Sequence, residues 1–142
     1  MERKETLTIS DYYRGKTILV TGPTGFIGKV LIWKLLQSCS DIDHIFILLR
    51  PKYNMDVRHR VAELLQTPVS TRSFIGFNFI EQFLRMTHDW FQIFDNFRKN
   101  NPHVLKKVKA IAGDIAEPKL GLTPGDEQQL VDSVHILSLI HI

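Results

Sequence analysis

Short apolar runs alternate with amphipathic stretches along this chain. The run at 17–21 is rich in β-branched residues and lies between glycines, a pattern typical of a strand buried on both faces. Comparable runs predict further strands at 45–49, 108–112 and 134–137. Arg50 and Pro51 end the second of them, because proline discourages continuation of a strand.

The stretch 26–38 predicts a helix between the first two strands. Its apolar positions Ile27, Leu31 and Leu35, with Val30 beside them, recur at helical spacing and form one stripe. We expect this stripe to pack on the sheet, so that strand, helix and strand form a βαβ unit.

A second helix is predicted after the second strand, with Asn54 or Asp56 as its N-cap. Another is predicted at 126–133, before the fourth strand. The apolar positions of the helix after 56 are Val57, Val61, Leu64 and Leu65. Such alternation predicts an α/β fold with a Rossmann-type, doubly wound parallel sheet, here incomplete with about four strands.

Composition narrows the function classes. Apolar residues make up 44% of the 142 residues and the net charge is +3, with Lys and Arg too scattered for a nucleic-acid-binding arm. An anionic small molecule is the expected partner. The single Cys39 and the polar 1–14 segment indicate an intracellular chain, and no stretch is apolar enough to span a membrane, so the chain is expected to be soluble.

A glycine-rich turn follows the first predicted strand. Gly22, Gly25 and Gly28 stand in a Gly-x-x-Gly-x-x-Gly spacing at the entrance to a helix. The first would permit a tight turn, the second would let backbone N–H groups approach a pyrophosphate, and the third would let the helix press against the strand. A glycine-rich turn without a ligand is the alternative. The predicted cofactor-binding residues here are Thr21, Gly22, Thr24, Gly25, Phe26, Ile27 and Gly28.

Arg50, at the end of the second strand, is the candidate reader of the adenosine ribose. A guanidinium can pair with a 2′-phosphate, whereas an acidic residue would accept from a 2′-hydroxyl, so Arg50 favours NADPH as cofactor. A surface arginine without a ligand is the alternative, and Lys52 is a second candidate. Asp114 and Ile115 end the third strand, where the sheet approaches an adenine ring, although a turn-capping aspartate would look the same.

Three segments carry a more specific resemblance. They are 22–38, 45–52 and 112–122, and the last reads Ala-Gly-Asp-Ile-Ala-Glu-Pro-Lys-Leu-Gly-Leu. Together they resemble alcohol-forming fatty acyl-CoA reductases of insect type, within the extended short-chain dehydrogenases. The resemblance identifies 15–136 as the N-terminal part of an NAD(P)-binding domain.

The resemblance implies reduction of a long-chain fatty acyl-CoA to a primary alcohol, with two NADPH consumed and coenzyme A released, by proteins that face the cytosol on peroxisomal or endoplasmic reticulum membranes. The family's Tyr-x-x-x-Lys pair lies far downstream of the glycines, so no catalytic residue is assigned here. Tyr12 and Lys16 match that spacing only by coincidence, because they precede the first strand. Residues 137–142 depart from the family pattern and are interpreted as a foreign tail, with no role for His135 or His141.

The block 69–92 interrupts the resemblance. It contains six of the chain's fourteen aromatic residues, and its flanks join into a family-like segment when it is removed. Its 24 residues correspond to 72 nucleotides, and Val-Ser and Phe-Gln at its ends can be encoded by GTAAGT and TTTCAG. We interpret it as a retained intron; an amphipathic membrane-surface element built on Ile80, Phe83 and Leu84 is the alternative.

Other chemistries have less support. The six histidines show no metal-site spacing, and no serine stands in a hydrolase motif. Two alternative functions stay open: a non-catalytic nucleotide-binding or interaction module, and another extended dehydrogenase, such as a carrier-thioester reductase or a sugar-nucleotide epimerase.

Overall fold

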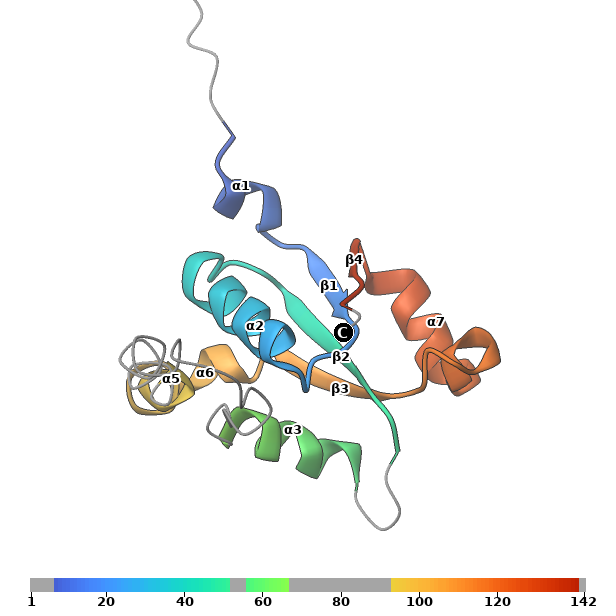
Figure 1. The fold of residues 1–142 in the computed structure, drawn as a ribbon. Coiled ribbons are helices and arrows are strands. Elements are labelled where there is room, and N and C mark those ends of the chain that lie inside the picture. Colours follow the sequence, from blue (N-terminus) through green and yellow to red (C-terminus); the bar gives the residue numbers. More distant parts are fainter. Residues whose placement is uncertain (1–6, 52–55, 67–92, 141–142) are drawn as a thin grey trace, which may run out of the picture.

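A parallel four-stranded sheet in the order β3-β2-β1-β4 forms the centre of the chain (Figure 1). The computed structural model describes residues 7–51, 56–66 and 93–140. The strands are β1 (Thr17–Val20), β2 (His44–Leu49), β3 (Val108–Ala112) and β4 (Ile136–Ser138). The expected Rossmann-type α/β fold is confirmed. All strands are parallel, and the order in which they are added reverses after β3, because β4 pairs with β1 at the other edge of the sheet, as in doubly wound folds.

Helices connect and cover the strands. They are α1 (Ile9–Tyr13), α2 (Phe26–Ser38), α3 (Val57–Gln66), α5 (Ile93–Asn100), α6 (Pro102–Leu105) and α7 (Pro124–Ser133), with a 3-10 turn, η2 (Pro118–Gly121), before α7. The predicted bounds of α2 are confirmed. Asp56 caps α3 as expected, because its Oδ1 accepts from the N–H of Arg58 at 3.2 Å, whereas Asn54 lies outside the described residues. None of the helices in the described ranges is long and apolar enough to cross a membrane.

The last helix and strand differ from their predicted bounds. α7 begins before the predicted residue 126, because the hydroxyl of Thr123 accepts from the N–H of Asp126 and Pro124 starts the helix. β4 begins later than predicted, because the N–H of Val134 still donates to the carbonyl of Leu130 in α7. At its other end β4 pairs with β1 as far as Ser138, and so enters the segment interpreted as a foreign tail. The origin of 137–142 stays a prediction.

Alternate strand residues enter two separate cores, one on each face of the sheet. α2 and α3 cover one face and α7 covers the other (Figure 1). Ile18 and Val20 of β1 join the first core, whereas Leu19 joins the second. The β-strand period of two explains this division, and burial of all four β1 residues confirms the prediction of a strand buried on both faces.

The buried side of α2 agrees with the predicted stripe only in part, because Leu35 is buried and Leu31 packs against the core as expected, whereas Ile27 does not. Ile27 is 52% exposed. The buried residues are Gly28, Ile32, Leu35 and Leu36. A Cβ on Gly28 would lie only 2.3 Å from the carbonyl oxygen of Gly22, so this contact fixes the rotation of α2 about its axis. Ile27 consequently points outward.

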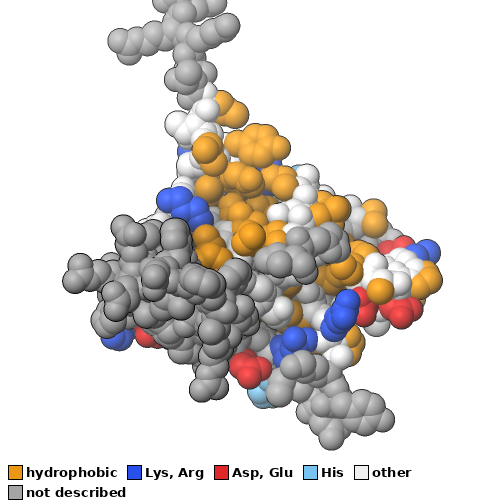
Figure 2. Space-filling model, in the orientation of Figure 1, with side chains coloured by type: hydrophobic (Ala, Val, Ile, Leu, Met, Phe, Trp, Pro, Cys, Tyr) orange, Lys and Arg blue, Asp and Glu red, His pale blue; other side chains and the backbone are white. Residues whose placement is uncertain are grey.

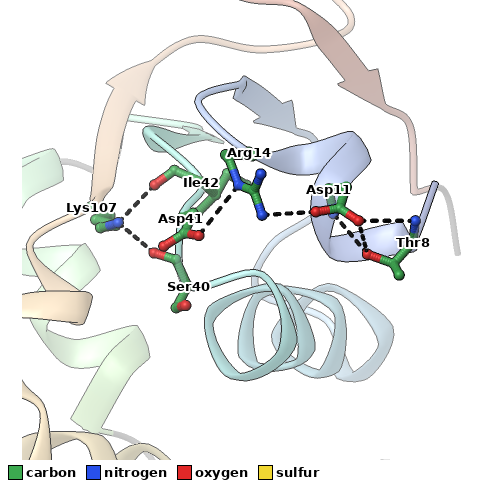
Figure 3. Close-up of polar contacts among 7 residues, drawn as sticks. All are labelled: Thr8, Asp11, Arg14, Ser40, Asp41, Ile42 and Lys107. Atoms are coloured by element: carbon green, nitrogen blue, oxygen red, sulfur yellow. Dashed lines mark hydrogen bonds and ion pairs between the residues drawn. The ribbon is translucent and has the colours of Figure 1, made fainter. Parts of the chain in front are cut away.

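Polar contacts tie the N-terminal helix to the edge of the sheet where β2 begins (Figure 3). The Asp11 carboxylate accepts from the Thr8 hydroxyl at 2.6 Å and from Arg14 Nη2 at 2.7 Å. Arg14 Nε also lies 3.6 Å from Asp41. Hydrogen bonds from Thr8 are the main reason that the pKa of Asp11 lies below its ordinary value. Part of the polar segment 1–14 is therefore an ordered helix.

Candidate functional site

A cavity of about 400 Å³ lies at the carboxyl ends of β1, β2 and β3. In open parallel sheets, ligands bind at this edge and at the point where the strand order reverses. Figure 2 shows basic side chains gathered near the end of β2 and the start of α3. The cavity is lined by Gly22, Pro23, Thr24, Gly25, Leu48, Leu49, Arg50, Arg60, Gly113, Ile115 and Ile140.

The glycine-rich turn forms one wall of this cavity. Gly22 has φ +65°, a left-handed conformation that favours glycine, and a Cβ there would lie 2.4 Å from the carbonyl oxygen of Ile140. Gly25 is the N-cap residue of α2, so this helix begins at the cavity. The first turn of α2 contains no acidic residue to offset its partial positive charge. The turn can therefore receive a phosphate group.

Two arginines line the same cavity as the glycine turn, one at the end of β2 and one in the first turn of α3. The Nε of Arg50 lies 3.1 Å from Oδ2 of Asp114. Arg60 donates from Nη1 to the backbone carbonyl of Arg50. Both arginines line the cavity, which therefore combines two guanidinium groups with the N-terminus of a helix. Such a set of groups suits an anionic ligand with more than one phosphate.

Asp114 is held by the loop that follows β3. Its Oδ1 accepts from the N–H of Ala116 at 3.0 Å, and its own N–H donates to the carbonyl of Leu120 at 2.8 Å. Gly113 before it has no room for a Cβ, which would lie 2.6 Å from the Leu120 oxygen. The carboxylate thus faces Arg50 from a backbone fixed at several points.

Several predicted site residues do not line the cavity. Thr21 is buried, and its Oγ1 accepts from the N–H of Ile140 at 3.2 Å, so its hydroxyl joins β1 to the segment after β4. Gly28 packs against the turn from inside, and Phe26 and Ile27 are not among the lining residues. Asp114 is not among them either, although its partner Arg50 is. Gly22, Thr24, Gly25, Arg50 and Ile115 line the cavity, and their binding of a cofactor stays a prediction. Lys52 lies outside the described residues.

Sequence reasoning missed Arg60 and Ile140. A signal for Arg60 was present, because a helix that follows a strand starts at the carboxyl edge of a parallel sheet, so a cation in its first turn lies near a ligand there. Ile140 gave no local signal, since it reaches the cavity only through the pairing of β4 with β1.

The Tyr12-x-x-x-Lys16 match lies away from the cavity. Lys16 Nζ is 3.6 Å from the centre of the Tyr12 ring, and both residues precede β1, at the edge where the strands begin. His135 has a structural role, because its Nδ1 accepts from the N–H of Thr17 at 3.2 Å. Burial raises the pKa of the Cys39 thiol, which lies in the core under α2. Within the described ranges, no three His, Cys, Asp or Glu side chains converge as metal ligands.

Comparison with known proteins identifies relatives of similar sequence. The sequence model of the family described as Male sterility protein matches residues 20–141. The chain is 33% identical over 131 residues to fatty acyl-CoA reductase 1 of Mus musculus, an alignment that covers 92% of this chain and 21% of that protein. It is 30% identical over 130 residues to fatty acyl-CoA reductase 2 of Homo sapiens, again with 92% and 21% coverage. The chain spans about a fifth of the length of these relatives.

Solved structures agree with the fold. The reductase domain of a non-ribosomal peptide synthetase from Mycobacterium tuberculosis superposes with a TM-score of 0.56 at 22% identity, over 89% of this chain and 24% of that chain. The terminal R domain from the myxalamid PKS-NRPS biosynthetic pathway gives 0.56 at 20% identity, over 90% and 25%. At these identities the likeness shows the fold alone.

Proposed function

Because the chain belongs to the Male sterility protein family, the NAD(P)-binding family of the fatty acyl-CoA reductases, we propose that it supplies the NADPH-binding part of an enzyme that reduces long-chain fatty acyl-CoA to a primary alcohol and releases coenzyme A. One observation carries this proposal: a single cavity joins the glycine turn to Arg50 at the carboxyl edge of the sheet.

The residues of the cavity fit the three parts of the adenine half of NADPH. The turn at Gly22 and Gly25, with the start of α2, would receive the pyrophosphate. Arg50, with Arg60 beside it, would pair with the 2′-phosphate. Ile115, which is 39% exposed, offers an apolar side chain for the adenine ring. NADPH supplies the hydride when it is bound; these residues bind and orient it.

Under this proposal no residue of the chain is catalytic. Tyr12 and Lys16 lie at the edge of the sheet where the strands begin, away from the cavity, so they could not deliver a proton to a substrate beside the nicotinamide. Most of the fatty acyl-CoA site would then be contributed by sequence outside these residues. We expect the purified chain alone to form no alcohol from acyl-CoA and NADPH.

Calorimetric titration with NADPH and NADH tests the proposal. The chain should bind NADPH more tightly than NADH, and Gly25→Val should abolish binding of both, because a branched side chain would occupy the space that the pyrophosphate needs. Gly25 has φ −72° and ψ 168°, a conformation that valine adopts readily, so the variant should still fold. Absence of NADPH binding by the parent, or unchanged binding by a folded Gly25→Val, would overturn the proposal.

A further inference from the structure

The ion pair between Arg50 and Asp114 has two unequal partners. The Arg50 side chain is 67% exposed, whereas that of Asp114 is 26% exposed. The pair joins the end of β2 to the end of β3 beside the candidate cavity. An exposed arginine is ordinarily mobile, so the carboxylate is the partner that can fix the geometry.

The loop after β3 makes Asp114 a rigid anchor. Lys119 and Leu120 both adopt positive φ, 53° and 60°, which side chains other than glycine rarely do. Such a conformation persists only where the surrounding structure determines it. Here the Leu120 carbonyl accepts from the Asp114 N–H, and the Asp114 carbonyl accepts from the Glu117 N–H at 3.1 Å. The turn is therefore hydrogen-bonded to the backbone of Asp114 on both sides of its peptide.

The ion pair leaves part of the Arg50 guanidinium available. Asp114 engages Nε, and Arg60 donates to the backbone carbonyl of Arg50, not to its side chain. Within 7–51, 56–66 and 93–140, the Arg50 guanidinium has no ion pair besides that with Asp114. Its Nη1 and Nη2 are therefore free of described partners, and the residue lines the cavity.

We propose that Asp114 is a positioning residue that holds Arg50 ready for the 2′-phosphate of the cofactor, a role separate from contact with the adenine ring. This inference rests on the proposed function. Arginine loses considerable side-chain freedom when it binds a ligand, and a preformed ion pair removes part of that cost in advance. Repulsion between the carboxylate and a phosphate works against this gain, but it is weakened by solvent screening and by the shared guanidinium.

Two nucleotide probes separate these roles: 2′,5′-ADP, which carries the 2′-phosphate, and 5′-AMP, which does not. Asp114→Asn keeps the size of the side chain and an oxygen for the Ala116 N–H, but removes the charge that pairs with Arg50. We expect the affinity of the chain for 2′,5′-ADP to fall by about three- to tenfold, and that for 5′-AMP to stay unchanged. In an Arg50→Ala background, Asp114→Asn should have no further effect.

Glu117→Gln is the matched control, since it removes an exposed negative charge from the same loop without breaking the Arg50 pair. It should leave the affinity ratio of the two nucleotides unchanged. Equal losses for both nucleotides in Asp114→Asn would show an adenine contact and overturn the inference. An unchanged or increased preference for 2′,5′-ADP would also overturn it. Failure of the proposed function looks different: the parent chain itself would bind neither nucleotide or would not distinguish them.

Discussion

Arg50 Nε lies 3.1 Å from Asp114 Oδ2, so an ion pair joins the ends of two neighbouring strands at the edge of the candidate cavity. Arg50 follows β2 and Asp114 follows β3, and the parallel register from Ile45–Val108 to Leu49–Ala112 brings them together. Arg50 and Asp114, which follow the last residues of these two strands, are thus the residues to which we assign recognition of the cofactor.

Replacing Arg50 should reduce cofactor discrimination. A charge-assisted hydrogen bond contributes about 1.5 to 3 kcal/mol, so Arg50→Ala should weaken NADPH binding by roughly ten- to a hundredfold and leave NADH binding nearly unchanged. Isothermal calorimetry measures both affinities. Lys99→Ala, which removes an exposed cation from α5, should change neither. Equal NADPH affinity before and after the Arg50 substitution would contradict the assignment.

Gly28 should tolerate no side chain. Its Cβ would lie 2.3 Å from the Gly22 oxygen and 2.8 Å from the Cα of Pro23, and backbone atoms cannot move aside as a flexible side chain can. Gly28→Ala should therefore destabilise the chain by at least about 1–3 kcal/mol. Gly125 in α7 has nothing within 4 Å of its Cβ, so Gly125→Ala should be neutral or stabilise by about 0.4–1 kcal/mol. Urea unfolding compares them; equal midpoints would contradict the close packing at Gly28.

The rotation of α2 predicts a large effect for replacing one isoleucine and a small effect for replacing another. Ile32 is 0% exposed and Ile27 is 52% exposed. Ile32→Ala should lower the free energy of unfolding by about 2–5 kcal/mol, whereas Ile27→Ala should change it by less than about 0.5 kcal/mol. Thermal or urea unfolding measures the difference. A larger loss of unfolding free energy for Ile27→Ala than for Ile32→Ala would show that Ile27 is buried, as the sequence pattern predicted.

Local patterns in the sequence determined what could be predicted. The β-branched run before Gly22 and the spacing of the glycines depend on neighbouring residues, and both β1 and the bounds of α2 followed from them. The orientation of α2 followed only in part: Leu31 and Leu35 face the core as predicted, but Ile27 does not, because the contact of Gly28 with Gly22 decides which side of the first turn is buried. Ile140 reaches the cavity only through strand pairing distant in sequence, which no local pattern records.

Acid should loosen α1 through Asp11. Because hydrogen bonds from Thr8 and the charge of Arg14 hold the pKa of Asp11 below its ordinary 3.8, the ionised carboxylate stabilises the folded helix above that value. This stabilisation is lost as the pH falls through the lowered pKa. Amide exchange at Tyr12, whose N–H donates to the Thr8 carbonyl, should therefore accelerate towards acid relative to an unstructured peptide. Asp11→Asn should remove this pH dependence, and Glu117→Gln should keep it.

The flanks of the block 69–92 pack directly on each other. Arg98 of α5 donates from Nη1 to the carbonyl of Leu65 near the end of α3, at 2.8 Å. Leu64, Leu65 and Phe94 belong to one buried cluster under the sheet. Residues 67–92 lie outside the described residues, so the contact between α3 and α5 is described from the flanks alone.

We predict that a chain without 69–92, with Pro68 joined to Ile93, folds with the same unfolding midpoint and binds NADPH with the same affinity as the parent. The reason is that α3 and α5 already meet through the Arg98–Leu65 hydrogen bond, and a two-residue connection through Thr67 and Pro68 is of ordinary length for neighbouring helices. Transcripts should include a form spliced at this junction, with GT and AG at the ends of the excised 72 nucleotides.

Arg98→Ala serves as a control, since loss of the hydrogen bond between the flanks should lower the stability of both the long and the short chain. Two results would contradict the prediction: a shortened chain that fails to fold, or transcripts that all keep the 72 nucleotides when these do not begin with GT and end with AG. The block would then be protein sequence, and the interpretation of Ile80, Phe83 and Leu84 as a membrane-surface element would replace that of an intron.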